Sequence, residues 1–274
     1  MFCINCQCVS GVVFLRHNDG LLLSCSRDGT VKLWELESGY CSRTFPDLHD
    51  GEWVKRVDVS YDGSLLVTCS VDKSVRVFSV EKEYQELCVL RGHEHVVEEV
   101  RFSNPNTDHI LLQKEDTDSD SDAESDEDSK NGGPSSSIKS SPHKVVMNGG
   151  ASTPKRLRAP RFVASASRDK SIMVWDLERE ECVMKLQGHE NWVRSLVFHP
   201  CGRFLISAAD DKSIRIWDLT KRRLYSKIDD AHQGFVSSID WHPTESLLAS
   251  VSTSKDLKVW HHDTKHHHKG KGGH

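Results

Sequence analysis

Residues 188–218 read GHENWVRSLVFHPCGRFLISAADDKSIRIWD, and this stretch decides the fold. It contains three apolar, β-branched runs separated by a Pro-Cys-Gly turn and an Asp-Asp-Lys turn, which is the punctuation expected of strands: 192–198, 203–209 and 213–218. A fourth strand-like run follows at 223–228. Four strands in about 40–45 residues, opened by Gly-His and with Trp-Asp closing the third strand, predict one blade of a β-propeller.

The rest of the chain repeats this unit. An aromatic residue ends the third strand of five copies: Trp34, Phe78, Trp175, Trp217 and Trp260. Their spacings are 44, 97, 42 and 43 residues, so the long step contains an insertion. The sequence therefore predicts an all-β propeller with five recognisable blades.

Polar residues recur at fixed places in the copies. An aspartate stands six residues before the aromatic in four of them: Asp28, Asp72, Asp169 and Asp211. A histidine precedes the first strand of the last four: His49, His93, His189 and His232. The indole N–H of a buried tryptophan needs an acceptor, and a hydroxyl can link it to a histidine that an aspartate orients. Ser70 and Ser167, two residues before their aspartates, are predicted to supply that hydroxyl.

These histidines and aspartates are therefore more typical of a structural network within each blade than of a catalytic pair. In the third and fourth copies the predicted network comprises His93, Ser167, Asp169, Trp175, His189, Asp211 and Trp217. Other copies depart from the pattern. Phe78 cannot donate a hydrogen bond, Ala209 replaces an expected hydroxyl, Ser254 replaces the fifth aspartate, and the first copy lacks Gly-His. We expect packing to hold those blades more than polar contacts do.

Composition narrows the class of protein. The 274 residues carry a net charge of −5, which is too mild to indicate nucleic-acid binding. The sequence shows no apolar run of about 20 residues and no signal-peptide pattern, so a cytoplasmic protein without a membrane span is expected. The nine scattered cysteines suit buried apolar positions in such a protein. Neither a G-x-S-x-G elbow nor a P-loop is present, so no enzyme activity and no cofactor are expected.

A metal site is the less favoured interpretation of the chain's two ends. Cys3, Cys6 and Cys8 contain one C-x-x-C pair, but no second pair follows at the spacing of a zinc finger. The tail at 261–274 is rich in histidine, and such tails more often bind metals adventitiously. We therefore predict no metal site.

The predicted organisation has four parts. Residues 1–102 form the first two blades and the start of the third, 161–260 form the rest, and 261–274 form a His/Lys/Gly-rich tail. Residues 103–160 are a polar insertion within the third blade, acidic first and then basic, and are expected to be disordered. Three serines in the acidic part precede acidic residues, as in acidophilic kinase substrates: Ser119, Ser121 and Ser125. A solvated loop without a specific role is an equally favoured interpretation.

The order of several motifs resembles WD-repeat proteins of the lissencephaly family of dynein regulators. The motifs are Ser-Arg-Asp-Lys-Ser-Ile at 167–172, Gly-His-Glu-Asn-Trp-Val-Arg at 188–194 and ELESGYCSRTF at 35–45. The family also carries an insertion in the blade that holds residues 103–160 here. The family has seven blades after a dimerisation segment, and the five units resemble the last five. The resemblance thus implies a partial or open relative of a seven-bladed ring.

The resemblance also implies a function. Members of the family bind the cytoplasmic dynein heavy chain and act in microtubule-based transport, nuclear migration and spindle positioning during cell division. Possible further partners are microtubules and NudE-type adaptors, and the implied location is the cytoplasm, cytoskeleton and centrosome. The family is also linked to a lipid acetylhydrolase, as its non-catalytic subunit. A general WD-repeat scaffold that presents the acidic loop to a partner is the alternative.

Matching the family's motifs places its dynein-binding face on five residues of this chain: Arg27, Lys55, Arg168, Trp192 and Lys212. These positions lie in turns between the second and third strands or near the start of a first strand, which share one face of a propeller. Arginine and tryptophan are also the types that dominate protein interfaces. Without the resemblance, the favoured interpretation would be that Arg27 and Arg168 brace neighbouring blades. Lys55 stands where the family has arginine, and lysine lacks the planar fork of the arginine guanidinium, so a weaker contact is expected there.

Overall fold

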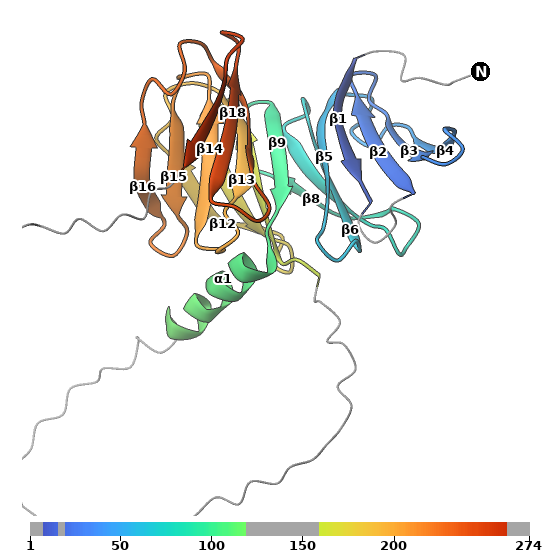
Figure 1. The fold of residues 1–274 in the computed structure, drawn as a ribbon. Coiled ribbons are helices and arrows are strands. Elements are labelled where there is room, and N and C mark those ends of the chain that lie inside the picture. Colours follow the sequence, from blue (N-terminus) through green and yellow to red (C-terminus); the bar gives the residue numbers. More distant parts are fainter. Residues whose placement is uncertain (1–7, 16–19, 119–158, 262–274) are drawn as a thin grey trace, which may run out of the picture.

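The computed structural model describes residues 8–15, 20–118 and 159–261. All of its strands lie in five antiparallel sheets, which we call blades 1 to 5 in chain order (Figure 1). Blades 1 and 2 consist of β1 (Val9–Phe14), β2 (Leu21–Ser26), β3 (Val31–Glu35), β4 (Cys41–Phe45), β5 (Val54–Val59), β6 (Leu65–Ser70), β7 (Ser74–Ser79) and β8 (Gln85–Arg91). Blades 3 to 5 consist of β9 (Val97–Phe102), β10 (Phe162–Ser167), β11 (Ser171–Asp176), β12 (Glu181–Gln187), β13 (Val193–Phe198), β14 (Phe204–Ala209), β15 (Ile214–Asp218), β16 (Arg223–Ile228), β17 (Val236–Trp241), β18 (Leu247–Ser252) and β19 (Leu257–His261).

Tight turns join the second and third strands of each blade. A lysine one or two residues before the third strand has a left-handed backbone in four blades, with φ of 66–70° at Lys73, Lys170, Lys212 and Lys255. Gly29 occupies the left-handed position in blade 1, with φ of 79°. The aspartate directly before the left-handed residue in blades 1 to 4 accepts hydrogen bonds within the turn, as Asp211 Oδ1 does from Ser213 N at 3.0 Å. This Asx geometry explains why the same turn sequence recurs.

The core lies between successive blades and forms four apolar clusters. The cluster between blades 3 and 4 contains Ile172 and Val174 on one side and Leu205 and Trp217 on the other. The tryptophan side of each blade therefore packs against the blade that precedes it. Strands such as β10 are buried along their whole length because both of their faces are covered. This explains why their sequences are continuously apolar or small instead of alternating.

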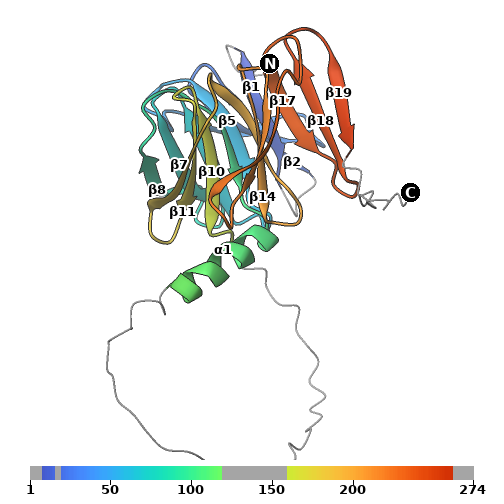
Figure 2. The ribbon, with the colours of Figure 1, turned by 90° about the vertical axis from the view of Figure 1, so that its left-hand side faces the viewer.

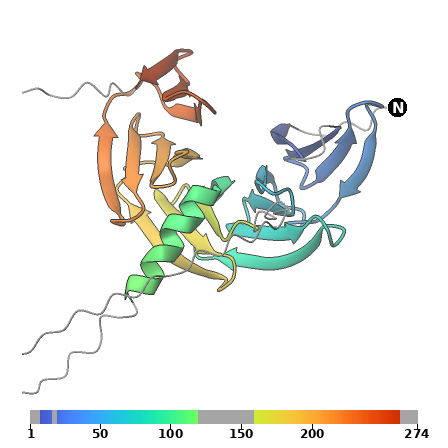
Figure 3. The same cartoon turned by 60° about the horizontal axis from the view of Figure 1, so that its bottom comes forward.

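The five blades follow an arc whose ends, blade 1 and blade 5, stand apart (Figure 3). The tryptophan side of blade 1 leaves Val12 and Phe14 60% and 61% exposed. The opposite side of blade 5 leaves Leu257 and Val259 65% and 59% exposed. The prediction of five propeller blades in an open arrangement is confirmed.

One helix interrupts blade 3, and this corrects the prediction that residues 103–160 are disordered. Helix α1 (Pro105–Asp118) follows β9 directly and lies beneath the propeller (Figures 1 and 2). Asn104 caps it, because Thr107 N donates to Asn104 Oδ1 at 2.9 Å. The average composition of the insertion is dominated by its acidic and serine-rich middle, which concealed this short ordered start. Residues 119–158, with Ser119, Ser121 and Ser125, and the tail at 262–274 lie outside the described residues, so their disorder stays a prediction.

Contacts with blade 4 and with neighbouring strands hold α1 in place. The side-chain amides of Asn104 and Asn106 donate to His199 O and Pro200 O at 3.1 and 2.7 Å. Gly202 makes this approach possible, because a Cβ there would lie 2.4 Å from the carbonyl carbon of Asn106. Leu111 is 9% exposed and joins the cluster between blades 3 and 4. The start of the insertion is therefore part of the folded propeller.

Two deletions should separate the contribution of α1 to stability from that of the rest of the insertion. Replacing residues 119–158 with a short Gly-Ser linker should leave the melting temperature nearly unchanged, because loop-closure entropy varies only slowly with length. Replacing 105–158 also removes the buried Leu111 and Asp108, which accepts hydrogen bonds from Ser103 Oγ and Arg161 N. This loss should cost about 2–4 kcal/mol. That loss corresponds to a fall of roughly 5–15 °C. Scanning calorimetry of both variants checks this, and equal melting temperatures would show that α1 adds no stability.

Candidate functional site

The polar network of blade 4 links four side chains in a chain of hydrogen bonds. Trp217 Nε1 donates to Ser207 Oγ at 2.8 Å, and Ser207 Oγ lies 2.7 Å from His189 Nε2. His189 Nδ1 lies 2.8 Å from Asp211 Oδ2. Since Ser207 already accepts from Trp217, its own proton goes to Nε2, and neutral His189 donates from Nδ1 to Asp211. These groups satisfy one another inside the blade, which fits a structural role.

The charge states agree with this assignment. Burial lowers the pKa of His189 and outweighs its contact with Asp211. Burial works to raise the pKa of Asp211, but the hydrogen bonds from His189 and Ser213 outweigh it and hold that pKa well below its ordinary value. A neutral histidine beside an ionised aspartate is therefore the form present at neutral pH. Blade 3 has the same network, with His93 bound to Asp169 at 2.7 Å and Trp175 bound through a serine.

The serine predicted to link the tryptophan to the histidine in blade 3 was wrong by two positions, because Ser165 has this role and Ser167 does not. Trp175 Nε1 and His93 Nε2 both contact Ser165 Oγ at 2.8 Å, and Ser167 takes a different role. Trp175 lies opposite Val163 in the sheet, so its diagonal neighbour on the same face is Ser165. Ser167 lies at the turn, where Asp169 N donates to its Oγ at 3.1 Å.

The same geometry corrects the expectations for Ser70, Ala209 and blade 2. In blade 2 the hydroxyl is that of Thr68, 2.7 Å from His49 Nε2, and Ser70 is a turn residue. Ala209 does not interrupt the network of blade 4, because Ser207 accepts the hydrogen bond from the Trp217 indole. Although Phe78 donates no hydrogen bond, His49 still contacts Asp72 at 2.9 Å.

Blade 5 also has a complete polar network, although packing was expected to hold it more than polar contacts do. His232 Nδ1 lies 2.8 Å from Asp256 Oδ2, and Trp260 Nε1 donates to Ser250 Oγ at 2.8 Å. Ser254, which occupies the expected aspartate position, donates to Asp256 Oδ1 at 2.6 Å. An aspartate two residues further on thus replaces the usual one as the partner of the histidine.

The residues predicted to bind a partner lie on the face opposite α1. Arg27, Arg168 and Lys212 lie in the turns that join second and third strands, whereas Lys55 and Trp192 lie at the start of first strands. The Arg168 guanidinium stacks on the Trp192 ring, with 4.3 Å from Cζ to the ring centroid. Lys55 Nζ lies 3.7 Å from the centroid of Trp53, and Arg27 Cζ lies 5.2 Å from it.

The structure brings four of these five residues into contacts across blades. Arg27 reaches from blade 1 to Trp53 before blade 2, and Arg168 reaches from blade 3 to Trp192 before blade 4. The bracing of neighbouring blades is therefore real, and it leaves the stacked rings half-buried at the surface. Lys212 is exposed, and within the described part of the chain it makes none of these contacts. We call Arg27, Trp53, Lys55, Arg168 and Trp192 the cation–aromatic face.

Sequence reasoning missed the acidic partners of this face. Glu98 is 8% exposed and pairs with Lys55 Nζ at 3.0 Å and with Arg168 Nε. Arg194 Nη1 lies 3.4 Å from Glu98, and Arg194 Nη2 lies 2.7 Å from Asp210. The Cζ atom of Arg194 also lies 4.9 Å from the centroid of the Trp192 ring.

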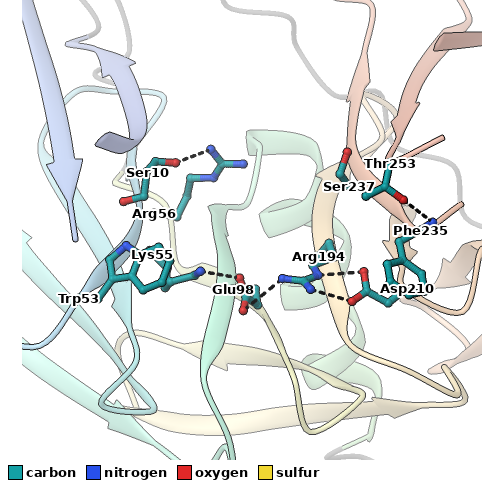
Figure 4. A pocket seen from close by; sticks show the side chains of 10 residues that line it. All are labelled: Ser10, Trp53, Lys55, Arg56, Glu98, Arg194, Asp210, Phe235, Ser237 and Thr253. Atoms are coloured by element: carbon teal, nitrogen blue, oxygen red, sulfur yellow. Dashed lines mark hydrogen bonds and ion pairs between the residues drawn. The ribbon is translucent and has the colours of Figure 1, made fainter. Parts of the chain in front are cut away.

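Aligning the blades could have found these partners. The second residue of the first strand is Ser10 in blade 1, Lys55 in blade 2, Glu98 in blade 3, Arg194 in blade 4 and Ser237 in blade 5. All five line one cavity of about 450 Å³ where the blades converge. Figure 4 shows Lys55, Glu98 and Arg194 meeting in it, with Trp53 and Phe235 at its sides.

Within the described ranges, no group of three or more His, Cys, Asp or Glu side chains is arranged to hold a metal ion. Cys3, Cys6 and most of the His-rich tail lie outside those ranges. None of the helices in the described part is long and apolar enough to cross a membrane. The contacts of Arg27, Lys55 and Arg168 with the two tryptophan rings make the cation–aromatic face the candidate functional site.

Comparisons with known proteins identify the repeat. The family model described as "WD domain, G-beta repeat" matches residues 4–35, 39–79, 158–176, 180–218 and 224–261. The chain is 35% identical to nuclear distribution protein nudF of Aspergillus niger over 195 residues, which is 71% of this chain and 36% of that protein. It is 34% identical to nudF of Emericella nidulans, again over 71% and 36%, and 34% identical to nuclear distribution protein PAC1 of Coccidioides posadasii, over 71% and 33%.

The chain thus spans about a third of the length of the curated relatives it matches. These nuclear distribution proteins bear out the resemblance to the lissencephaly family, since the similarity covers 71% of this chain. The repeat matches five times and accounts for most of the described blades. The chain therefore belongs to the WD-repeat family.

Proposed function

We propose that this chain is a non-catalytic WD-repeat protein that binds the cytoplasmic dynein heavy chain through its cation–aromatic face. The observation that carries the proposal is the stack of Arg168 on Trp192, flanked by Arg27 and Lys55, on one exposed side of the propeller. Half-buried arginine and tryptophan pairs are the groups that dominate interface energies. The relatives' name, nuclear distribution protein, supports a role in nuclear migration.

The same proposal covers the wider setting. It places the chain in the cytoplasm at the cytoskeleton and centrosome, in microtubule-based transport and spindle positioning, with microtubules and NudE-type adaptors as further partners. A second candidate is a scaffold that presents the acidic insertion to a partner. Helix α1 favours it in one respect, because the helix fixes the start of the insertion on the face opposite Arg168 and Trp192. Both surfaces could then be occupied at once.

Binding of a purified dynein motor domain tests the proposal. Replacing both Arg168 and Trp192 with alanine should abolish detectable binding, because each such truncation typically costs about 2 kcal/mol or more. Arg168 also pairs with Glu98, so the double variant could lose stability as well. Lys212→Glu avoids this difficulty. Lys212 is exposed in a turn on the same side of the propeller as the cation–aromatic face, so its replacement should weaken binding at an unchanged melting temperature.

The control is Lys221→Glu, an exposed lysine in the turn after β15, on the side of α1. It makes the same charge change away from the proposed face and should leave binding unchanged. Failure of the wild-type chain to bind the motor domain would reject the dynein proposal and leave the scaffold. Undiminished binding by a folded double variant would reject this face.

A further inference from the structure

One buried carboxylate lies at the centre of the cation–aromatic face. The side chain of Glu98 is 6% exposed and receives three basic groups from three blades. Lys55 of blade 2 contacts Oε2 at 3.0 Å, whereas Arg168 of blade 3 and Arg194 of blade 4 contact Oε1, the latter at 3.4 Å. Figure 4 shows the Lys55–Glu98–Arg194 part of this arrangement at the wall of the cavity.

The surroundings of Glu98 keep it charged. Burial works to raise the pKa of Glu98, but the charge of Lys55 and the hydrogen bond from Arg168 outweigh it and leave the pKa below its ordinary value. A buried charge is tolerated only when paired, and this one has more than one cation as partner. Glu98 is therefore an anion at neutral pH and attracts all three basic side chains at once.

Each cation that Glu98 holds also contacts an aromatic ring of the face. Lys55 lies 3.7 Å from the Trp53 centroid, and Arg168 lies 4.3 Å from the Trp192 centroid. Free lysine and arginine side chains lose about 0.5–1.5 kcal/mol each when an interface immobilises them. Side chains that are already fixed in the unbound protein avoid that cost. The ion pairs with Glu98 thus place both cations over their rings before any partner arrives.

We propose that Glu98 is a positioning residue for partner binding: it fixes Lys55 and Arg168 in the geometry that the partner meets, without contacting the partner itself. This inference rests on the proposed function. It also explains why the second residue of the first strand, which lines the cavity, is acidic in blade 3 but basic in blades 2 and 4. An alternating arrangement of Lys55, Glu98 and Arg194 pairs every charge with its neighbour.

Glu98→Gln tests the proposal through the sign of its effect. The substitution keeps the shape of the side chain and makes the face more positive by one charge. If net positive charge alone attracted the partner, affinity would rise or stay the same. If Glu98 positions the cations, affinity for the dynein motor domain should fall by about tenfold, because two side chains must then be ordered on binding. Titration calorimetry, at a temperature where the protein is folded, measures this.

Glu99→Gln is the matched control. Glu99 follows Glu98 in β9, is completely buried, and pairs with Arg56 at 2.9 Å and with Arg101, outside the cation–aromatic face. Both substitutions should lower the melting temperature, because each leaves buried cations less well paired. Only Glu98→Gln should reduce affinity. Equal affinities of the two variants would overturn the positioning role.

Glu98→Asp keeps the experiment decisive if the glutamine variant does not fold. Aspartate retains the buried negative charge but is one methylene shorter, so it cannot reach all three cations. A positioning role predicts weaker binding, whereas charge compensation alone predicts wild-type affinity. Wild-type affinity would overturn the inference even if Arg168→Ala with Trp192→Ala abolishes binding. Absence of binding by the wild type would instead reject the proposed function and this inference with it.

Discussion

Trp217→Ala is expected to lower the free energy of unfolding by about 3–5 kcal/mol, the usual cost of removing a large buried side chain. Trp217 is 2% exposed in the cluster between blades 3 and 4, and its indole donates to Ser207. The substitution leaves a large cavity and also removes one end of the network that includes His189. Since single domains are stable by about 5–15 kcal/mol, the variant should be only marginally folded.

Trp34→Ala is the matched comparison and should cost much less, about 1–2 kcal/mol. Trp34 holds the same position in blade 1 and makes the same bond, from Nε1 to Ser24 Oγ at 2.8 Å. Its ring is only half-buried, because blade 1 has no preceding blade on that side. Urea denaturation of both variants measures the difference. Equal losses would show that another surface covers blade 1 in solution.

The repeat made the fold predictable because a blade is a local unit. Spacing of the aromatic residues from Trp34 to Trp260 predicted five blades, and the tight turns predicted where strands begin and end. The choice between Ser165 and Ser167 was not predictable from spacing to the aspartate, because it depends on the diagonal register between β10 and β11. Helix α1 was missed because contacts with the distant His199 and Pro200 hold it, and composition does not report such contacts.

The candidate site was predictable only in part. The positions of Arg168 and Trp192 followed from motifs, and the structure places them in contact. The involvement of Glu98 was not predicted, because it depends on side chains from three blades that meet at one cavity. A residue-by-residue alignment of the blades contains that information, since Lys55, Glu98 and Arg194 occupy the same place in their strands. Charge complementarity between neighbouring repeats is therefore the signal that local motif reading overlooks.

The two free sides of the arc predict the behaviour of the purified chain in solution. Each blade normally covers both sheet faces with neighbours, and among the described residues no further blade covers the outer side of blade 1 or of blade 5. Phe14 lies opposite Leu22, which lies opposite Trp34, so these residues share one uncovered face. On blade 5, Leu257 lies opposite Val251 and Val259 lies opposite Ala249 on the other uncovered face. Contiguous exposed apolar faces favour association.

We therefore expect the purified chain to be oligomeric or poorly soluble, and four substitutions should reverse this: Val12→Glu, Phe14→Glu, Leu257→Glu and Val259→Glu. These side chains are about 60% exposed, so charging them should change stability little while removing both apolar faces. Leu87→Glu with Leu224→Glu, on the outer strands β8 and β16, is the control and should leave association unchanged. Sedimentation velocity at two concentrations distinguishes the variants. A monodisperse wild-type monomer that melts cooperatively would instead show that five blades suffice, because the two uncovered faces then cost too little to drive association.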